Sequence, residues 1–83
     1  MATFLVERFW PGLTAAGAET ATTALARAGA VIVETIVADT DEVCLWYVEA
    51  AATSDVVAAF RDAAVPIDRI GPATRLRRRP ASG

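Results

Sequence analysis

Two kinds of apolar pattern occur along this chain, and together they predict four strands and two helices. Short runs rich in β-branched and aromatic residues are typical of strands, and they cover residues 3–9, 31–37 and 42–49. Residues 73–77 follow a turn-rich connection and can form a last strand at the sheet edge. Alanine-rich stretches with apolar residues at helical spacing predict helices at residues 14–28 and 55–64. The order β-α-β-β-α-β is that of the ferredoxin-like α+β fold, a four-stranded antiparallel sheet with two helices on one face.

Residues near the helix ends support these bounds. Thr14 is a candidate N-cap for the first helix, and Gly29 lies where a glycine commonly ends a helix. Thr53 or Ser54 is the corresponding N-cap candidate for the second helix. Residues 67–72 are rich in turn-forming residues, so we assign them to a connection before the last strand.

Both faces of the predicted sheet are apolar, which is unusual for a sheet that water covers on one side. Phe4 and Val6 alternate with Leu5 and Phe9 in the first strand. The second and third strands give four more sets: Ile32 and Ile36 against Val31, Val33 and Val37; Cys44, Trp46 and Val48 against Val43, Leu45 and Tyr47. Because two helices bury only one face, we predict a homodimer packed sheet against sheet, an assembly of the dimeric α/β-barrel type.

The length of 83 residues indicates one domain, which we place at residues 1–77 with a basic tail at 78–83. Hydrophobic residues make up 54% of the chain, yet no apolar run approaches the roughly 20 residues of a membrane-spanning helix. The first residues lack the features of a signal peptide. We therefore expect a soluble, cytoplasmic protein that does not associate with membranes.

Charge is unevenly distributed. The net charge is −2, but Arg75, Arg77, Arg78 and Arg79 lie together near the C-terminal end. This cluster is either a basic arm for phosphate or acidic surfaces, or a set of charges that discourages strand addition at a sheet edge. We favour the second interpretation and expect no nucleic-acid partner, because no aromatic residues alternate with the arginines to stack on bases.

The chain contains no histidine and one cysteine, Cys44. Histidine is the commonest acid–base residue near neutral pH and the commonest ligand of transition metals. Without a histidine to accept its proton, Cys44 is better interpreted as a small buried hydrophobic residue than as a nucleophile. We therefore assign no metal ligands, catalytic residues or cofactor, and favour a non-enzymatic protein over an enzyme.

Several short motifs occur in an order that resembles a known family. They are Phe4-Leu5-Val6-Glu7-Arg8, Pro11-Gly12-Leu13-Thr14, Val37-Ala38-Asp39, Cys44-Leu45-Trp46 and Val65-Pro66-Ile67-Asp68-Arg69-Ile70. Over residues 3–76 the chain resembles the DUF4242 family of small bacterial ferredoxin-like proteins. The resemblance implies a homodimer, and nickel binding has been associated with a member of that family.

The chain departs from this family at its histidines. Family members commonly have a histidine at the position of Glu34, and another near Ala59 or Phe60. One carboxylate without an imidazole is a poor nickel site, because nickel suits nitrogen ligands. The resemblance therefore does not carry nickel binding over to these residues.

Three glutamates interrupt apolar strands and are the remaining candidates for chemistry: Glu7, Glu34 and Glu49. Each could face a cavity between two sheets and act there as a general base. The alternative, which we favour, is that each lies near a strand end or pairs with an arginine, Arg8 or Arg75 being available. The aromatic residues could line a ligand pocket, or they could belong to the core or the dimer interface: Trp10, Trp46, Tyr47 and Phe60. As a ligand site we single out Glu7, Glu34, Trp46 and Tyr47.

Three classes of function agree with these observations. We favour a small homodimeric module without enzymatic activity that binds a small molecule or a partner. The second is a dimeric α/β-barrel enzyme with a glutamate base, and the third is a protein of the DUF4242 type that binds nickel or another divalent metal through carboxylates and Cys44. Fold alone does not choose among them.

Overall fold

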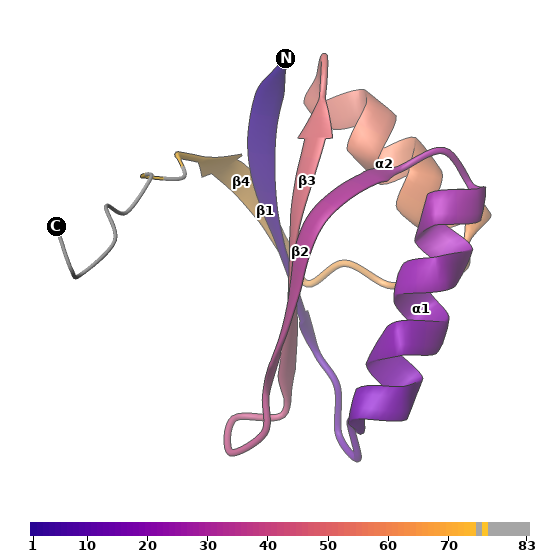
Figure 1. Ribbon diagram of the computed structural model, residues 1–83, viewed down its shortest axis with the longest axis vertical. Coiled ribbons are helices and arrows are strands. Elements are labelled where there is room, and N and C mark those ends of the chain that lie inside the picture. The colour runs from indigo at the N-terminus through magenta and orange to yellow at the C-terminus, as the bar shows by residue number, and fades with distance from the viewer. Residues whose placement is uncertain (75, 77–83) are drawn as a thin grey trace, which may run out of the picture.

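The computed structural model describes residues 1–74 and 76, which form a four-stranded sheet and two helices. The elements follow the predicted order β-α-β-β-α-β (Figure 1). Their bounds are β1 Ala2–Phe9, α1 Ala15–Arg27, β2 Val31–Ala38, β3 Val43–Ala50, α2 Thr53–Asp62 and β4 Arg69–Ala73.

The strands lie in the order β2-β3-β1-β4, and every neighbouring pair is antiparallel. Both helices cover the same face of the sheet (Figure 1). This arrangement confirms the predicted ferredoxin-like α+β fold. Within the described residues, neither helix has the length and apolar character needed to cross a membrane.

Helix α1 begins and ends at the residues that the sequence predicts. The Thr14 side chain accepts a hydrogen bond from the Gly17 backbone N–H, which satisfies one of the free donors of the first turn. At the other end Gly29 has a φ of 99°, and the Ala30 N–H donates to the Leu25 carbonyl. This is the Schellman arrangement, in which glycine adopts the left-handed conformation without steric cost.

Helix α2 lacks both of these favourable end residues. Its N-cap is Ala52, which has no side-chain acceptor, so the prediction of Thr53 or Ser54 as the cap is wrong by one or two positions. At its C-terminal end the Val65 N–H donates to the Phe60 carbonyl, again a Schellman bond, but the left-handed position is Ala64 with a φ of 58°. A Cβ atom makes that conformation unfavourable.

The core lies between the helices and the covered face of the sheet. Strands β1 and β3 contribute every second side chain to it, and both helices contribute an apolar stripe. Its fully buried members include Val6, Leu25, Trp46 and Phe60, and the last two rings meet edge to face with centroids 5.4 Å apart. Such aromatic pairs stabilise a core beyond the area that they bury.

Strand β2 contains a bulge that reverses the predicted faces of its second half. Val31 pairs with Glu49 and Ile32 with Val48, but Glu34 pairs with Tyr47, so the register shifts by one residue around Val33. One extra residue in a strand exchanges the two faces beyond it. The prediction that Ile32 and Ile36 share a face is therefore wrong.

The last strand lies earlier than the sequence predicts. Residues 69–73 form β4, which pairs with β1, whereas we assigned 67–72 to a connection and 73–77 to the strand. The prediction is wrong because Gly71 and Pro72 are typical of turns. Here Pro72 lies in an edge strand, the usual position for a proline within a sheet. The arginine cluster and the tail at 78–83 lie outside the described residues.

Candidate functional site

The sheet face opposite the helices carries most of the candidate residues. Residues paired across neighbouring strands point to the same side, and Leu5 pairs with Tyr47, which in turn pairs with Glu34. We call this side the open face. Its central members come from three adjacent strands: Leu5, Glu7 and Phe9 of β1, Val43, Leu45, Tyr47 and Glu49 of β3, and Glu34 and Ile36 of β2.

Most of these central residues are apolar and only partly buried. Leu5, Leu45 and Tyr47 are half-buried, and Phe9 is 58% exposed. By contrast, Val6 and Trp46 on the covered face are fully buried. The prediction of apolar residues on both faces is thus confirmed for β1 and β3.

Glu7 lies on the open face beside an arginine of the edge strand. Its Oε2 atom is 3.8 Å from the Nε atom of Arg69, its partner in the β1–β4 ladder. Arg69 is not one of the candidate partners that the sequence suggests, Arg8 and Arg75, because the sequence predicts a connection at residues 67–72. The Glu7 and Arg69 side chains help to line a hollow of about 240 Å³ together with Leu5, Gly71 and Pro72.

Glu34 and Tyr47 are brought together by the shifted register of β2. With Ile36 they line a second hollow on the open face, of about 430 Å³, to which Thr74 and Leu76 also contribute. A carboxylate, a phenol and apolar side chains are a suitable lining for a small organic molecule, which needs mainly apolar contact and a few polar groups. Two of the four predicted ligand-binding residues therefore share one hollow.

Trp46 does not belong to this group. Its side chain lies on the covered face with no exposed surface, and its Nε1–H donates to Thr22 Oγ1 at 3.0 Å. Thr22 Oγ1 lies 2.8 Å from the Ala18 carbonyl and 3.1 Å from Thr35 Oγ1. Because a hydroxyl has one proton, Thr22 donates to Ala18 and accepts from both Trp46 and Thr35. Trp46 is thus a core residue, and its predicted grouping with the other three is wrong.

Cys44 is also part of the core. Its side chain is fully buried, as the sequence predicts, and it forms no disulfide. Burial raises the pKa of the Cys44 thiol above its ordinary value of 9.0, although the nearby Arg8 charge and a hydrogen bond from the Leu45 backbone oppose this shift. A buried, protonated thiol is a poor nucleophile.

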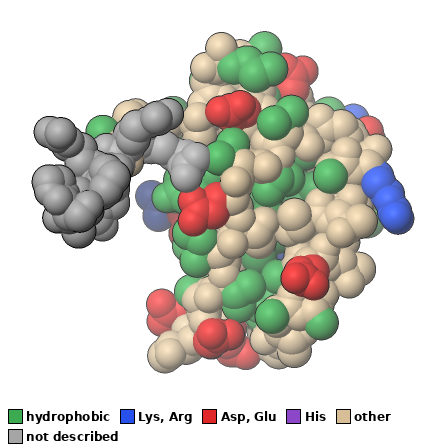
Figure 2. Space-filling model, in the orientation of Figure 1, with side chains coloured by type: hydrophobic (Ala, Val, Ile, Leu, Met, Phe, Trp, Pro, Cys, Tyr) green, Lys and Arg blue, Asp and Glu red, His purple; other side chains and the backbone are tan. Residues whose placement is uncertain are grey.

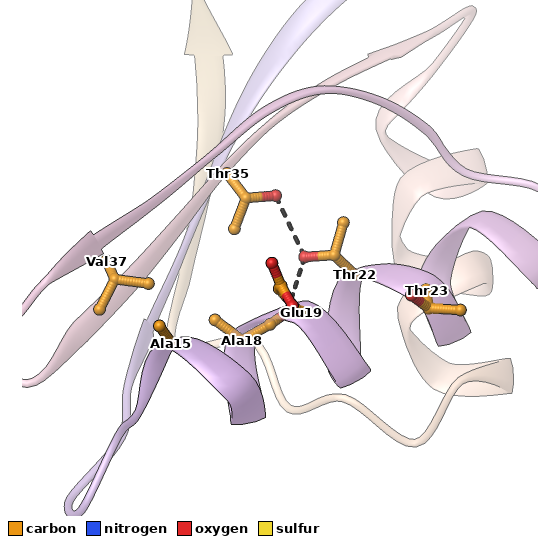
Figure 3. Close-up of a pocket in the computed structure, with 7 residues that line it drawn as sticks. All are labelled: Ala15, Ala18, Glu19, Thr22, Thr23, Thr35 and Val37. Atoms are coloured by element: carbon orange, nitrogen blue, oxygen red, sulfur yellow. Dashed lines mark hydrogen bonds between the residues drawn. The ribbon is translucent and has the colours of Figure 1, made fainter.

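A groove on the helix side runs between α1 and the edge strand β2 (Figure 3). Its volume is about 490 Å³. Its lining consists of alanines and threonines together with one carboxylate and one valine: Ala15, Ala18, Thr22, Thr23, Thr35, Glu19 and Val37. This groove was not predicted from the sequence, since isolated threonines and alanines carry no distinctive motif.

No metal centre is evident in the described part of the chain. Among residues 1–74 and 76, no three histidine, cysteine, aspartate or glutamate side chains are grouped so that they could hold a metal ion.

Comparison of the chain with protein-family models, with curated proteins and with solved structures gives no match.

Proposed function

We propose that this protein is a homodimeric binding module without enzymatic activity, in which two copies pack with their open faces together. The observation that supports this proposal is the apolar character of the open face across three adjacent strands. Its apolar side chains are Leu5, Phe9, Ile36, Val43, Leu45 and Tyr47. Burial of apolar area is the main favourable contribution to such an association.

The polar residues of this face are compatible with a symmetric interface. Glu7 already lies beside Arg69, so its charge would be partly compensated within each copy. Glu49 pairs with Thr3 near the far end of β1, away from Phe9 and Val43. The apolar side chains of the face can therefore form most of an interface, with Glu7 among them and compensated by Arg69 of the same copy.

A ligand site follows from the same packing. The hollow lined by Glu34, Ile36 and Tyr47 is open to solvent in one copy. A second sheet laid over it would enclose the hollow and complete its walls. We infer that the bound molecule is a small organic compound with an apolar body and a group that can hydrogen-bond to the Glu34 carboxylate or the Tyr47 hydroxyl.

Substitution of Leu45 tests the proposed interface. Leu45→Glu places a second carboxylate opposite Glu7, so two such faces would repel and the dimer should dissociate. Val57→Glu is the matched control because Val57 is a 41% exposed apolar residue on α2, on the other side of the sheet. Light scattering after size-exclusion chromatography should give a monomer for the first variant and a dimer for the second. Equal masses for the two variants would contradict the proposal.

A further inference from the structure

Strand β2 is an exposed sheet edge in the described part of the chain. It is the first strand in the order β2-β3-β1-β4, and no described strand lies beyond it. It runs for eight residues, mostly β-branched, without proline, lysine or arginine. An edge strand directs one row of backbone N–H and C=O groups away from the sheet, which makes it a template for another strand. The opposite edge, β4, is shorter and carries Pro72.

The groove between α1 and β2 lies beside this edge. Figure 3 shows Thr35 and Val37 of β2 facing Ala15 and Ala18 of α1. Apart from Glu19, the lining side chains on α1 are alanine and threonine, so space remains between the helix and the strand. The regular part of β2 after the bulge, residues 34–38, is the part that borders the groove. A strand added here would form backbone hydrogen bonds with β2 and place alternate side chains in the groove.

The charge of the surroundings indicates which strand would bind. All ten acidic residues of the chain, but only four of its eight arginines, lie within residues 1–74. Glu19 lines the groove, and Asp39 and Asp41 lie in the turn that follows β2. In the space-filling view, acidic side chains are scattered over this face and basic ones lie near its margins (Figure 2). Two β2 edges paired with each other would bring like charges together, whereas a basic segment would be attracted.

We propose that the β2 edge and the α1–β2 groove bind an extended basic peptide of a partner protein by strand addition. The peptide has small or β-branched apolar residues at alternate positions, which enter the groove between Ala15 and Val37. It has arginine or lysine at the intervening positions, which point to the other side of the sheet, the side of Glu34. The backbone hydrogen bonds and the groove are on the edge and helix side of the sheet, whereas the proposed dimer interface is centred on β1 and β3 of the open face.

Fluorescence anisotropy with a fluorescein-labelled peptide of alternating valine and arginine tests this proposal. Ala15→Trp fills the groove and should weaken binding by about tenfold or more, equivalent to ~1.4 kcal/mol. Ala16→Trp is the matched control, because this exposed neighbour lies outside the groove. It should change the affinity by less than about twofold. Unchanged binding in Ala15→Trp, or no binding to the unmodified protein, would overturn the proposal.

Two further measurements distinguish strand addition from charge attraction alone and from self-association. The same peptide with alternate backbone amides N-methylated, which removes hydrogen-bond donors but keeps the charge, should not bind. If it binds as well as the parent peptide, the attraction is merely electrostatic and the proposal fails.

The Leu45→Glu variant should bind the parent peptide normally, even if the open face is a dimer interface. If instead Ala15→Trp lowers the mass of the protein alone, β2 pairs with a second copy and the peptide proposal is wrong.

Discussion

Side-chain hydrogen bonds join three elements of the fold through one hydroxyl. Thr22 lies on α1, Thr35 on β2 and Trp46 on β3. Thr22 Oγ1 is 3.1 Å from Thr35 Oγ1 and 3.0 Å from Trp46 Nε1. A fully buried indole N–H needs an acceptor, because an unsatisfied buried donor carries its full desolvation cost. Thr22 therefore fixes how α1 lies against the sheet and, with it, the width of the α1–β2 groove.

Replacing Thr22 tests this role. Thr22→Val keeps the shape of the side chain but leaves the Trp46 Nε1–H without its acceptor. The free energy of unfolding should fall by about 1–3 kcal/mol, measured by urea denaturation. Thr20→Val is the control, since the exposed Thr20 hydroxyl bonds to the Ala16 carbonyl of its own helix. A change of less than about 0.5 kcal/mol is expected there. Equal losses in the two variants would contradict the assigned role.

The buried thiol of Cys44 makes the stability depend on pH. Its pKa is raised in the folded protein, so the unfolded chain releases the proton at lower pH than the folded one. The contribution of the protonated thiol to the free energy of unfolding is therefore fully present below the pKa of the unfolded chain, near 9.0, and is lost as the pH rises above that value. The slope due to one group cannot exceed about 1.4 kcal/mol per pH unit.

Urea denaturation between about pH 8 and 10 measures this effect. The Cys44→Ala variant lacks the thiol and should show a shallower loss of stability over the same range, although it is less stable at neutral pH. The two proteins differ in no other ionisable group, so the difference between their profiles reports on the thiol. Parallel pH profiles would show that Cys44 does not contribute.

The ends of the two helices show what sequence signals can and cannot specify. Thr14 and Gly29 are residue types with strong positional preferences, and both act as predicted. Helix α2 ends in the same Schellman hydrogen bonds without a glycine, because the packing of Val65 and Phe60 in the core imposes the turn on Ala64. Tertiary packing here overrides local preference.

Substitutions at the left-handed positions should have opposite effects. Ala64→Gly relieves the Cβ strain and should raise the free energy of unfolding by about 0.5–1 kcal/mol, after allowance for the greater freedom of glycine in the unfolded chain. Gly29→Ala introduces that strain at a φ of 99° and should lower stability by at least about 1 kcal/mol. Thermal denaturation of the two variants measures both changes. A loss of stability in Ala64→Gly would contradict the assignment of Cβ strain to the α2 end.

Strand register was the part of the fold that the sequence could not specify. Residues 31–33 are all β-branched and apolar, so nothing in the pattern marks the extra residue around Val33. In β4, Gly71 and Pro72 are residue types that commonly form turns, but an edge strand tolerates both. Element types and order depend on many residues and could be predicted, whereas one-residue shifts depend on pairing between distant strands.

The candidate site was partly predictable, because the alternation of side chains along a strand can be followed in the sequence. Alternation in β1 and β3 places Glu7 and Tyr47 on one face, and the bulge adds Glu34 to that face. The same alternation separates Trp46 from Tyr47, so the period of two already excluded the grouping that we predicted. The α1–β2 groove, by contrast, depends on how a helix packs over a sheet edge, which no local pattern describes.

Covering the apolar open face would stabilise the folded protein. A chain of 83 residues buries a small core, and a second copy would add apolar burial that the monomer lacks. If the folded form is a dimer, its thermal midpoint must rise with protein concentration by mass action.

Scanning calorimetry over a range of protein concentrations checks this expectation. The midpoint of the unmodified protein should increase with concentration, whereas that of Leu45→Glu should stay constant. A midpoint independent of concentration in both proteins would indicate a monomer that is stable by itself.

The mass of the unmodified protein in solution shows directly whether a second copy covers the open face. Sedimentation velocity at micromolar concentration should give twice the chain mass of 8.7 kDa. A single species at the mass of one chain would contradict the proposed dimer and, with it, the enclosed ligand hollow at Glu34 and Tyr47.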